Sequence, residues 1–287
     1  MGKTRNCSLL NISIIRLVKK LCRPGEVVNL RRMKFVAHQV LFTFSLIYLT
    51  AQMNLPAGFA ADAPVEKRMT IARVIYEGGG DWYSNPSSLP NLLAAIRKHT
   101  GLAVDEREVQ ISLKSPELFN YPYLYLNGHG NIKFDEEEVA RLRKYLDEGG
   151  FLHADDNYGM DKSFRREMKK VFPETDFVEL PFDFPIYHTV FDFPQGLPKV
   201  HEHDGGPPKG LGIFSRGKLV VFYSLNTDLG DGWEDAEVHH DPEPIRQQAL
   251  KMGVNIFLYA QIYSFFKSLY AYFFEIRVTP ASDMAIS

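Results

Sequence analysis

Residues 149–157 read GGFLHADDN, and this stretch decides the fold that the rest of the chain completes. The two glycines end a helix that begins at Asp135, with an acidic first turn and apolar residues at helical spacing. Phe151–Ala154 is apolar enough for a buried strand, and a basic helix follows at 160–172. A strand between two helices, joined by short glycine-rich connections, predicts a parallel sheet covered by helices.

The same alternation extends over most of the chain. Further strands are predicted at 70–76, 109–113 and 123–126, and a helix at 87–100 begins with a capping serine and an early proline. After an irregular, proline-rich segment at 177–210, we expect a hairpin formed by 212–214 and 218–224, a turn-rich acidic loop at 227–234 and a last helix at 245–260. The predicted fold class is α/β, with a mostly parallel central sheet and helices on both faces.

Polar turns follow three of the predicted strands, at 78–82, 127–130 and 153–157. Ligands of such folds bind beyond the carboxyl ends of the strands, so we expect these turns to share one polar cleft. Burial of a carboxylate beside a histidine would move their pKa values apart, as acid/base chemistry requires. The candidate catalytic residues are His129, His153, Asp155 and Asp156. The candidate ligand-binding residues are Asp81, Trp82, Gly128, Asn157, His203, Asp228, Asp231 and Trp233.

Each candidate also has a plainer interpretation. The aspartates at 155, 156 and 161 are suited to capping the following helix, and NGHG at 127–130 is also typical of a simple turn. In HEHD at 201–204 consecutive side chains alternate, so that at most His201 with His203, or Glu202 with Asp204, would converge on a metal ion. DLGDGWE at 228–234 lacks the calcium-loop spacing, and His239-His240 is expected to be solvated. We therefore assign no metal ion and no cofactor.

Composition limits the function classes. Residues 1–60 carry nine lysines and arginines against one glutamate, so with a net charge of −2 for all 287 residues the remainder is acidic, at −10. Nucleic acid is therefore not an expected partner, because phosphate binding needs a basic face. The two cysteines, Cys7 and Cys22, both precede residue 60, which excludes a cysteine nucleophile from the rest of the chain. A small polar or sugar-like ligand is the expected partner.

The first sixty residues are typical of an export signal. A basic region is followed by the apolar stretch 40–51 and by small residues at 57–61, which predicts a secretory signal peptide cleaved after Ala60. Met33 directly precedes this signal and is an alternative start. An uncleaved membrane anchor and a twin-arginine signal at 31–32 are the alternatives. The predicted location is periplasmic or secreted.

The C-terminal segment 256–274 is almost entirely apolar or aromatic. It is consistent with a helix packed on the domain, a segment that contacts a membrane, or a tail. The predicted organisation is a basic N-terminal segment and signal peptide at 1–60, an α/β domain at 61–262 and an aromatic-rich tail at 263–287.

Six sequence blocks between Met69 and Ala260 resemble the DUF4159 family of bacterial proteins. They read GGGDWYSNPSSLPNLL, YLYLNGHGNIKF, GGFLHADDNYGMDKSFRREM, ELPFDFPIYH, GLPKVHEHDG and TDLGDGWED, in this order. More distantly, 149–154, 184–186 and 196–198 are similar to the ThuA-like branch of the class I glutamine amidotransferase-like superfamily. That resemblance implies a flavodoxin-like three-layer sandwich.

The resemblance does not bring the amidotransferase activity with it. Where that superfamily places its cysteine nucleophile, this sequence reads His153-Ala154-Asp155-Asp156. The sequence therefore predicts a non-catalytic ligand-binding or cell-envelope scaffold domain. The alternative is a hydrolase-type enzyme that uses a histidine–aspartate pair on a small polar or sugar-like substrate.

Overall fold

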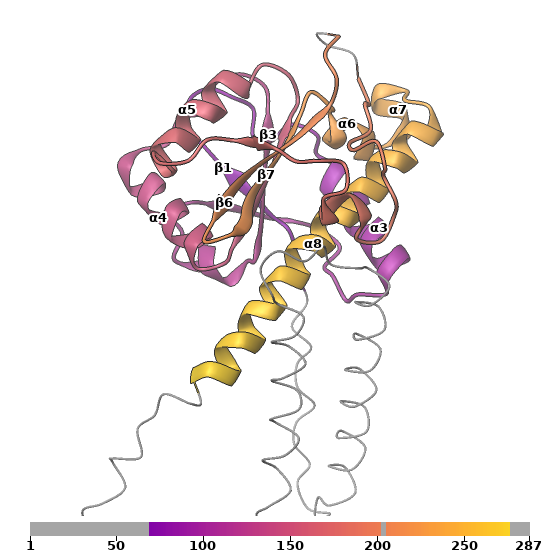
Figure 1. Ribbon diagram of the computed structural model, residues 1–287. Coiled ribbons are helices and arrows are strands. Elements are labelled where there is room, and N and C mark those ends of the chain that lie inside the picture. The colour runs from indigo at the N-terminus through magenta and orange to yellow at the C-terminus, as the bar shows by residue number, and fades with distance from the viewer. Residues whose placement is uncertain (1–68, 202–204, 276–287) are drawn as a thin grey trace, which may run out of the picture. The chain divides into compact units, whose positions relative to one another are not determined.

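The computed structural model describes residues 69–201 and 205–275, all of which lie in the second of two compact units, Glu66–Ser287. A seven-stranded sheet forms the centre of this unit, in the strand order β2-β1-β3-β4-β7-β6-β5 (Figure 1). Its strands are β1 (Ala72–Ile75), β2 (Val109–Ser112), β3 (Tyr123–Gly128), β4 (Phe151–Asp156), β5 (Val178–Glu179), β6 (Lys209–Ser215) and β7 (Lys218–Leu225).

The sheet is mostly parallel, as the sequence predicts. Strands β2, β1, β3, β4 and β7 pair in parallel, and the hairpin of β6 and β7 with the short β5 adds antiparallel pairs at one side. The central strands β3 and β4 are buried along their whole length. Both extend two residues beyond their predicted ends, so that Asn127, Gly128, Asp155 and Asp156 belong to strands and not to the turns after them.

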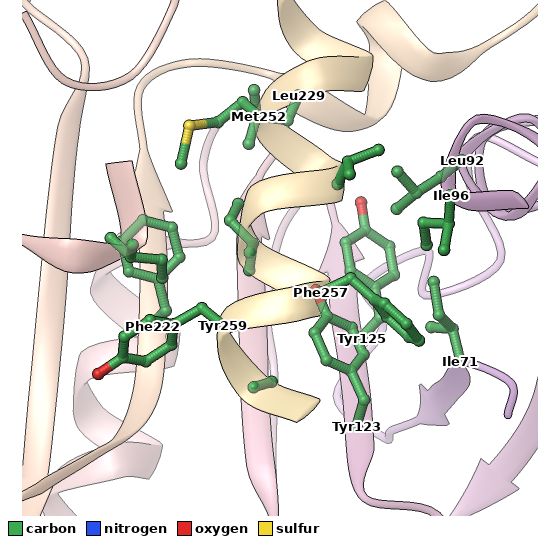
Figure 2. Close-up of a cluster of buried hydrophobic side chains, with 14 of the residues drawn as sticks. Ile71, Leu92, Ile96, Tyr123, Tyr125, Phe222, Leu229, Met252, Phe257 and Tyr259 are labelled. Atoms are coloured by element: carbon green, nitrogen blue, oxygen red, sulfur yellow. The ribbon is translucent and has the colours of Figure 1, made fainter. Parts of the chain in front are cut away.

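Helices cover both faces of the sheet and complete an α/β sandwich of three layers. Helices α3 (Ser88–Thr100) and α8 (Glu243–Glu275) pack on one face, while α4 (Glu136–Asp147) and α5 (Asp161–Val171) pack on the other (Figure 1). Figure 2 shows α8 lying across the sheet, with Phe257 close to Tyr123 and Tyr125 of β3. The two apolar clusters account for the runs of hydrophobic residues in β3 and β4, because parallel strands are buried on both faces.

Of two helix caps predicted from the sequence, one is confirmed and one is wrong. Asp135 caps α4 in a capping box with Glu138, as its acidic first turn predicts. The predicted serine cap of α3 is wrong, because the N-cap residue Ser87 makes no capping bond. Its hydroxyl instead donates to Glu234, 3.0 Å away. The loop between Asn85 and α3 is thereby tied to Glu234, 147 residues further along the chain.

Short helices lie in segments for which the sequence predicts no helix. The 3₁₀ helices η1 (Pro116–Asn120) and η2 (Pro185–His188) begin with prolines, and the predicted acidic loop at 227–234 contains the helix α6 (Leu229–Trp233). Helix α7 (Ala236–His239) follows it directly. Apolar packing of Leu229 and Trp233 against α8 explains why glycine-rich residues form a helix at this place.

The last helix is longer than the expected 245–260. Helix α8 continues through residue 262, the predicted border between domain and tail, and reaches Glu275. Between residues 69 and 275, no helix has both the length and the sustained apolar character needed to cross a membrane. The predicted signal peptide and its cleavage point lie outside the described residues.

Candidate functional site

The predicted site residues lie at the carboxyl ends of β1, β3 and β4 and in α6, but they form two groups. One group is buried between the sheet and α6 and includes His153, Asp155 and Asn157. The other is exposed at the loops after β1 and β3 and consists of Asp81 and His129. His203, which was expected beside them, lies outside the described residues.

A hydrogen-bonded chain, here called the buried network, runs through Tyr123, His153, Ser224 and Asp155. His153 Nδ1 lies 2.9 Å from the Tyr123 hydroxyl, and its Nε2 lies 2.9 Å from Ser224 Oγ. The Ser224 hydroxyl donates to Asp155 Oδ1, so it must accept from His153, and the imidazole proton is therefore on Nε2. Asp155 Oδ2 accepts the backbone N–H of Gly230 at 2.6 Å. Strand alternation explains the arrangement, since β3, β4 and β7 each point these residues to the α8 face.

The electrostatics of the buried network keep its histidine neutral. Burial lowers the pKa of His153 to about 3 and raises the pKa of Asp155 to about 7. The shifts are opposite in direction and one hydroxyl joins the two groups, as acid/base chemistry would require. Both side chains are, however, fully shielded from solvent. The network in this arrangement holds β4 and β7 to α6 and offers a substrate no access.

Other predicted residues are also enclosed, on one or the other face of the sheet. Asp156 points to the opposite face and accepts the backbone N–H of Tyr158 at 3.1 Å, while the N-cap of α5 has no side-chain cap. Burial, together with the charges of Asp155 and Asp231, raises the pKa of Asp228 to about 9. Trp233 is fully buried and donates its indole N–H to the Ala249 carbonyl at 2.8 Å, which is a core position.

The exposed group is built by glycine-rich loops. Asp81 accepts the backbone N–H of His129 with one oxygen, and its other oxygen lies 3.0 Å from His129 Nδ1. The ring nitrogen Nε2 is on the side of the imidazole that faces away from Asp81. Gly128 has a φ of 135°, and a Cβ on it would collide with the Tyr76 hydroxyl, so only glycine permits this approach of the two loops.

Aromatic side chains stand close in sequence to this exposed group. Trp82 is half-buried and packs edge-to-face on Tyr83, with ring centroids 5.5 Å apart. Tyr83 and Tyr158 are 64% and 53% exposed, and Tyr158 precedes Gly159, which approaches Gly130. Two hollows of the described surface lie elsewhere: one of about 140 Å³ beside Arg165 and Phe177, and a smaller one beside Gly150 and Lys218.

Metal-capable groups converge at a third place. The ligand atoms of His201, Asp231 and His239 all lie within 4.8 Å of one another. His201 thus meets a histidine from α7, while the other three residues of its HEHD stretch lie outside the described residues. Both residues of His239-His240 are exposed, as expected, and His239 Nε2 also lies 3.4 Å from Glu234. Because the partners come from three separate segments, no local spacing in the sequence indicates this arrangement.

Sequence reasoning also missed residues that organise the site. Arg73 of β1 is 1% exposed and holds the loop after β1 through hydrogen bonds, among them those to the Ser84 carbonyl (2.7 Å) and the Asn127 side chain (2.9 Å). Asn85 donates to Asp231 at 2.6 Å. Arg73 is the single charged residue in the mostly apolar stretch TIARVIY at 70–76, and this could have indicated its role. An arginine buried in a strand must find several hydrogen-bond acceptors.

Comparison with known proteins places the chain in a family. No curated protein matches it. The family profile described as "Domain of unknown function (DUF4159)" matches residues 70–261, which include β1 through most of α8 and every site residue described above. The match covers more than half of the chain and agrees with the resemblance of the six sequence blocks. The chain therefore belongs to the DUF4159 family.

Proposed function

We propose that this domain binds a small polar or sugar-like ligand, without transforming it, at the loops that follow β1 and β3. The observation that carries the proposal is the Asp81–His129 pair, whose side chains are 34% and 48% exposed. Carboxylate and imidazole groups suit a ligand rich in hydroxyl groups, because together they offer both acceptors and a donor.

The strand order supports this place. The parallel strands follow the order β2-β1-β3-β4-β7, and the direction of winding reverses between β1 and β3. Loops diverge at such a reversal, and ligands of open α/β sheets bind in the crevice between them. Asp81 and His129 come from the two loops at this reversal. The exposed rings of Tyr83 and Tyr158 are apolar platforms of the kind that sugar rings stack on.

The same order supports the finer classification of the fold. Counted along the chain, the parallel strands have the order 2-1-3-4-5, which is that of flavodoxin-like proteins. We therefore propose a flavodoxin-like sandwich, distantly similar to ThuA-like domains. The antiparallel β6 and β5 are additions at one edge.

The enclosure of the buried network favours binding over hydrolysis. A hydrolase that used His153 and Asp155 would need its substrate within hydrogen-bond reach of them. Both side chains are fully buried, and every nitrogen of His153 already has a protein partner.

We further propose that the chain is exported and acts in the periplasm or outside the cell. The support is the order of basic, apolar and small residues up to Ala60. Mass spectrometry of the protein recovered from its producing cell tests this, because export with cleavage predicts a mature N-terminus at Ala61. An intact N-terminus in the membrane fraction would favour the uncleaved anchor instead.

The binding proposal is tested by calorimetric titration of the full chain with glucose, N-acetylglucosamine and trehalose. We expect saturable binding of at least one sugar, with Kd of about 1 mM or tighter, and its loss in His129→Ala and Asp81→Asn. The matched control is His240→Asn, an exposed histidine with a positive φ of 57° that asparagine tolerates. Binding that is equal in all three variants, or absent from the wild-type chain for every sugar, would contradict the proposal.

A further inference from the structure

We propose that His201, Asp231 and His239 form a binding site for a first-row divalent transition-metal ion such as Zn²⁺. This histidine–aspartate cluster is distinct from the Asp81–His129 pair, so either proposal can fail without the other. Its three residues come from the loop before β6, from α6 and from α7. A bound ion would therefore join the loop before β6 to the two consecutive short helices α6 and α7.

The positions of the three side chains carry the argument. His201 Nδ1 lies 3.0 Å from Asp231 Oδ2, and His239 Nε2 lies 3.8 Å from Asp231 Oδ1. The two imidazole rings have centroids 5.2 Å apart and meet edge to face. Atoms bound to one ion at about 2.0–2.2 Å are separated by roughly 3–4 Å, so only small movements separate this arrangement from coordination.

Neighbouring residues orient two of the three side chains, His201 and Asp231, as supporting residues do in metal sites. His201 Nε2 lies 2.8 Å from Asp241 Oδ1, which directs Nδ1 toward Asp231. Asp231 Oδ1 is held by the amides of Asn85 and Asn157, at 2.6 Å and 3.2 Å. The Asp241 carboxylate thus fixes the orientation of the His201 ring, the two amides fix that of the Asp231 carboxylate, and such partners are typical of protein metal sites.

Two further carboxylates, those of Glu234 and Asp241, favour the binding of a cation at this place. Glu234 is 3% exposed and directs Oε2 toward His239 at 3.4 Å, while its Oε1 accepts from Ser87. The Asp241 side chain is 8% exposed, and its second carboxylate oxygen is buried without a hydrogen-bond partner within the described segments. Three carboxylates thus surround two imidazoles at a mostly buried place, where unpaired negative charge is costly and a bound cation would offset it.

The donor set selects the class of ion. Two imidazole nitrogens with carboxylate oxygens suit Zn²⁺, Co²⁺, Ni²⁺ or Fe²⁺, whereas Ca²⁺ and Mg²⁺ prefer sites made of oxygen alone. Asp231, His201 and His239 would be the ligands, Glu234 is placed to be a fourth, and Asp241 is a positioning residue. His239 is the best residue to remove, because its side chain is 28% exposed on a short surface helix.

The test uses the full chain after treatment with a chelator, titrated with Zn²⁺ by calorimetry and with Co²⁺ by visible absorption. We expect one ion per chain and a Co²⁺ spectrum typical of nitrogen and oxygen ligands. Asp241→Asn should weaken binding about tenfold to a hundredfold, as loss of a supporting carboxylate does. His239→Ala removes a ligand and should weaken binding by at least about a hundredfold, while His240→Asn should bind as the wild-type chain does.

The proposal is overturned if the wild-type chain binds neither ion stoichiometrically, or if His239→Ala binds both with unchanged affinity. The circular dichroism of each variant shows whether it is folded. Should His239→Ala be unfolded, the Asp241→Asn variant and the wild-type Co²⁺ spectrum decide the matter instead. A wild-type spectrum of hexaaquo Co²⁺ would also count against the site.

Discussion

The side-chain amide of Asn85 donates a 2.6 Å hydrogen bond to the carboxylate of Asp231, across 146 residues of sequence. This contact joins the loop after β1 to helix α6, which covers the carboxyl ends of the central strands. Both residues are buried, and Asn85 has a φ of 58° that few other residue types adopt without strain.

Asn85→Asp replaces this hydrogen bond with two facing carboxylates and keeps the size and backbone preference of the residue. We expect the free energy of unfolding to fall by about 1–3 kcal/mol, because a buried donor is lost and like charges meet. Urea denaturation of the full chain measures the change. Asn120→Asp, on the exposed end of η1, is the control and should change stability little. An equal effect of both substitutions would show that the Asn85–Asp231 contact is not what stabilises α6.

The buried network should impose two opposite pH dependences that cancel in the wild-type chain. Unfolding raises the pKa of His153 from about 3 to 6.5, so its contribution to stability is lost as pH falls from 6.5 to 3. Asp155 has a folded pKa of about 7 against 3.8 when unfolded, so its contribution is lost as pH rises between these values. Between pH 4 and 6.5 the two slopes oppose each other.

Single substitutions separate these slopes. Relative to the wild-type chain, His153→Phe should lose stability as pH rises over this range, and Asp155→Asn should gain it, each by at most about 1.36 kcal/mol per pH unit. Urea midpoints measured at half-unit pH steps give both slopes. If the two variants change with pH in the same direction, the protonation states assigned to the network are wrong.

Gly128 and Gly130 flank His129 and should respond differently to the same substitution. Both have positive φ, but a Cβ on Gly128 would collide with Tyr76, whereas one on Gly130 meets nothing closer than 3.9 Å. We expect Gly128→Ala to lower the free energy of unfolding by about 3 kcal/mol and Gly130→Ala by about 1 kcal/mol. Thermal denaturation of the two variants side by side is sufficient. Equal losses would mean that conformation alone, and not the close approach of the loops, requires glycine at 128.

Arg73 should be one of the most sensitive positions of the domain. Arg73→Met keeps an unbranched apolar stem but removes the guanidinium, which leaves the acceptors of the loop after β1, including the Ser84 carbonyl and Asn127, without a donor. Breaking such a buried charged contact costs about 3–5 kcal/mol. Denaturant unfolding of Arg73→Met and of the exposed control Arg107→Met gives the comparison. A change below about 1 kcal/mol would contradict the role assigned to the guanidinium.

Most of the fold is predictable from sequence because its strands and helices are locally marked. The capping box at Asp135, the glycines after α4 and the hairpin around Arg216-Gly217 are all short-range patterns, and the structure bears them out. That His153 and Asp155 point to the same face of the sheet was predictable, since residues two apart in a strand share a face. The partner strand β7, which supplies Ser224, could not be inferred from spacing.

The parts of the site that could not be predicted from the sequence are formed largely by loops. His201 and Asn85 lie in irregular segments and His239 in the short helix α7, and all three meet Asp231 only because these segments fold around α6. Such paths depend on long-range packing that no local pattern records. The acidic loop at 227–234 was misjudged for a similar reason. Its glycines disfavour a helix locally, but burial of Leu229 and Trp233 against the core outweighs that preference.

The two edges of the sheet bear on how the domain meets copies of itself. One border strand, β2, has four residues, and the other, β5, has only two. Unsatisfied main-chain amides along a long straight border invite intermolecular β-pairing, which leads toward aggregation. Borders this short present little main chain for such pairing. Self-association through these margins would therefore rely on side-chain recognition and not on extension of the sheet from one molecule into the next.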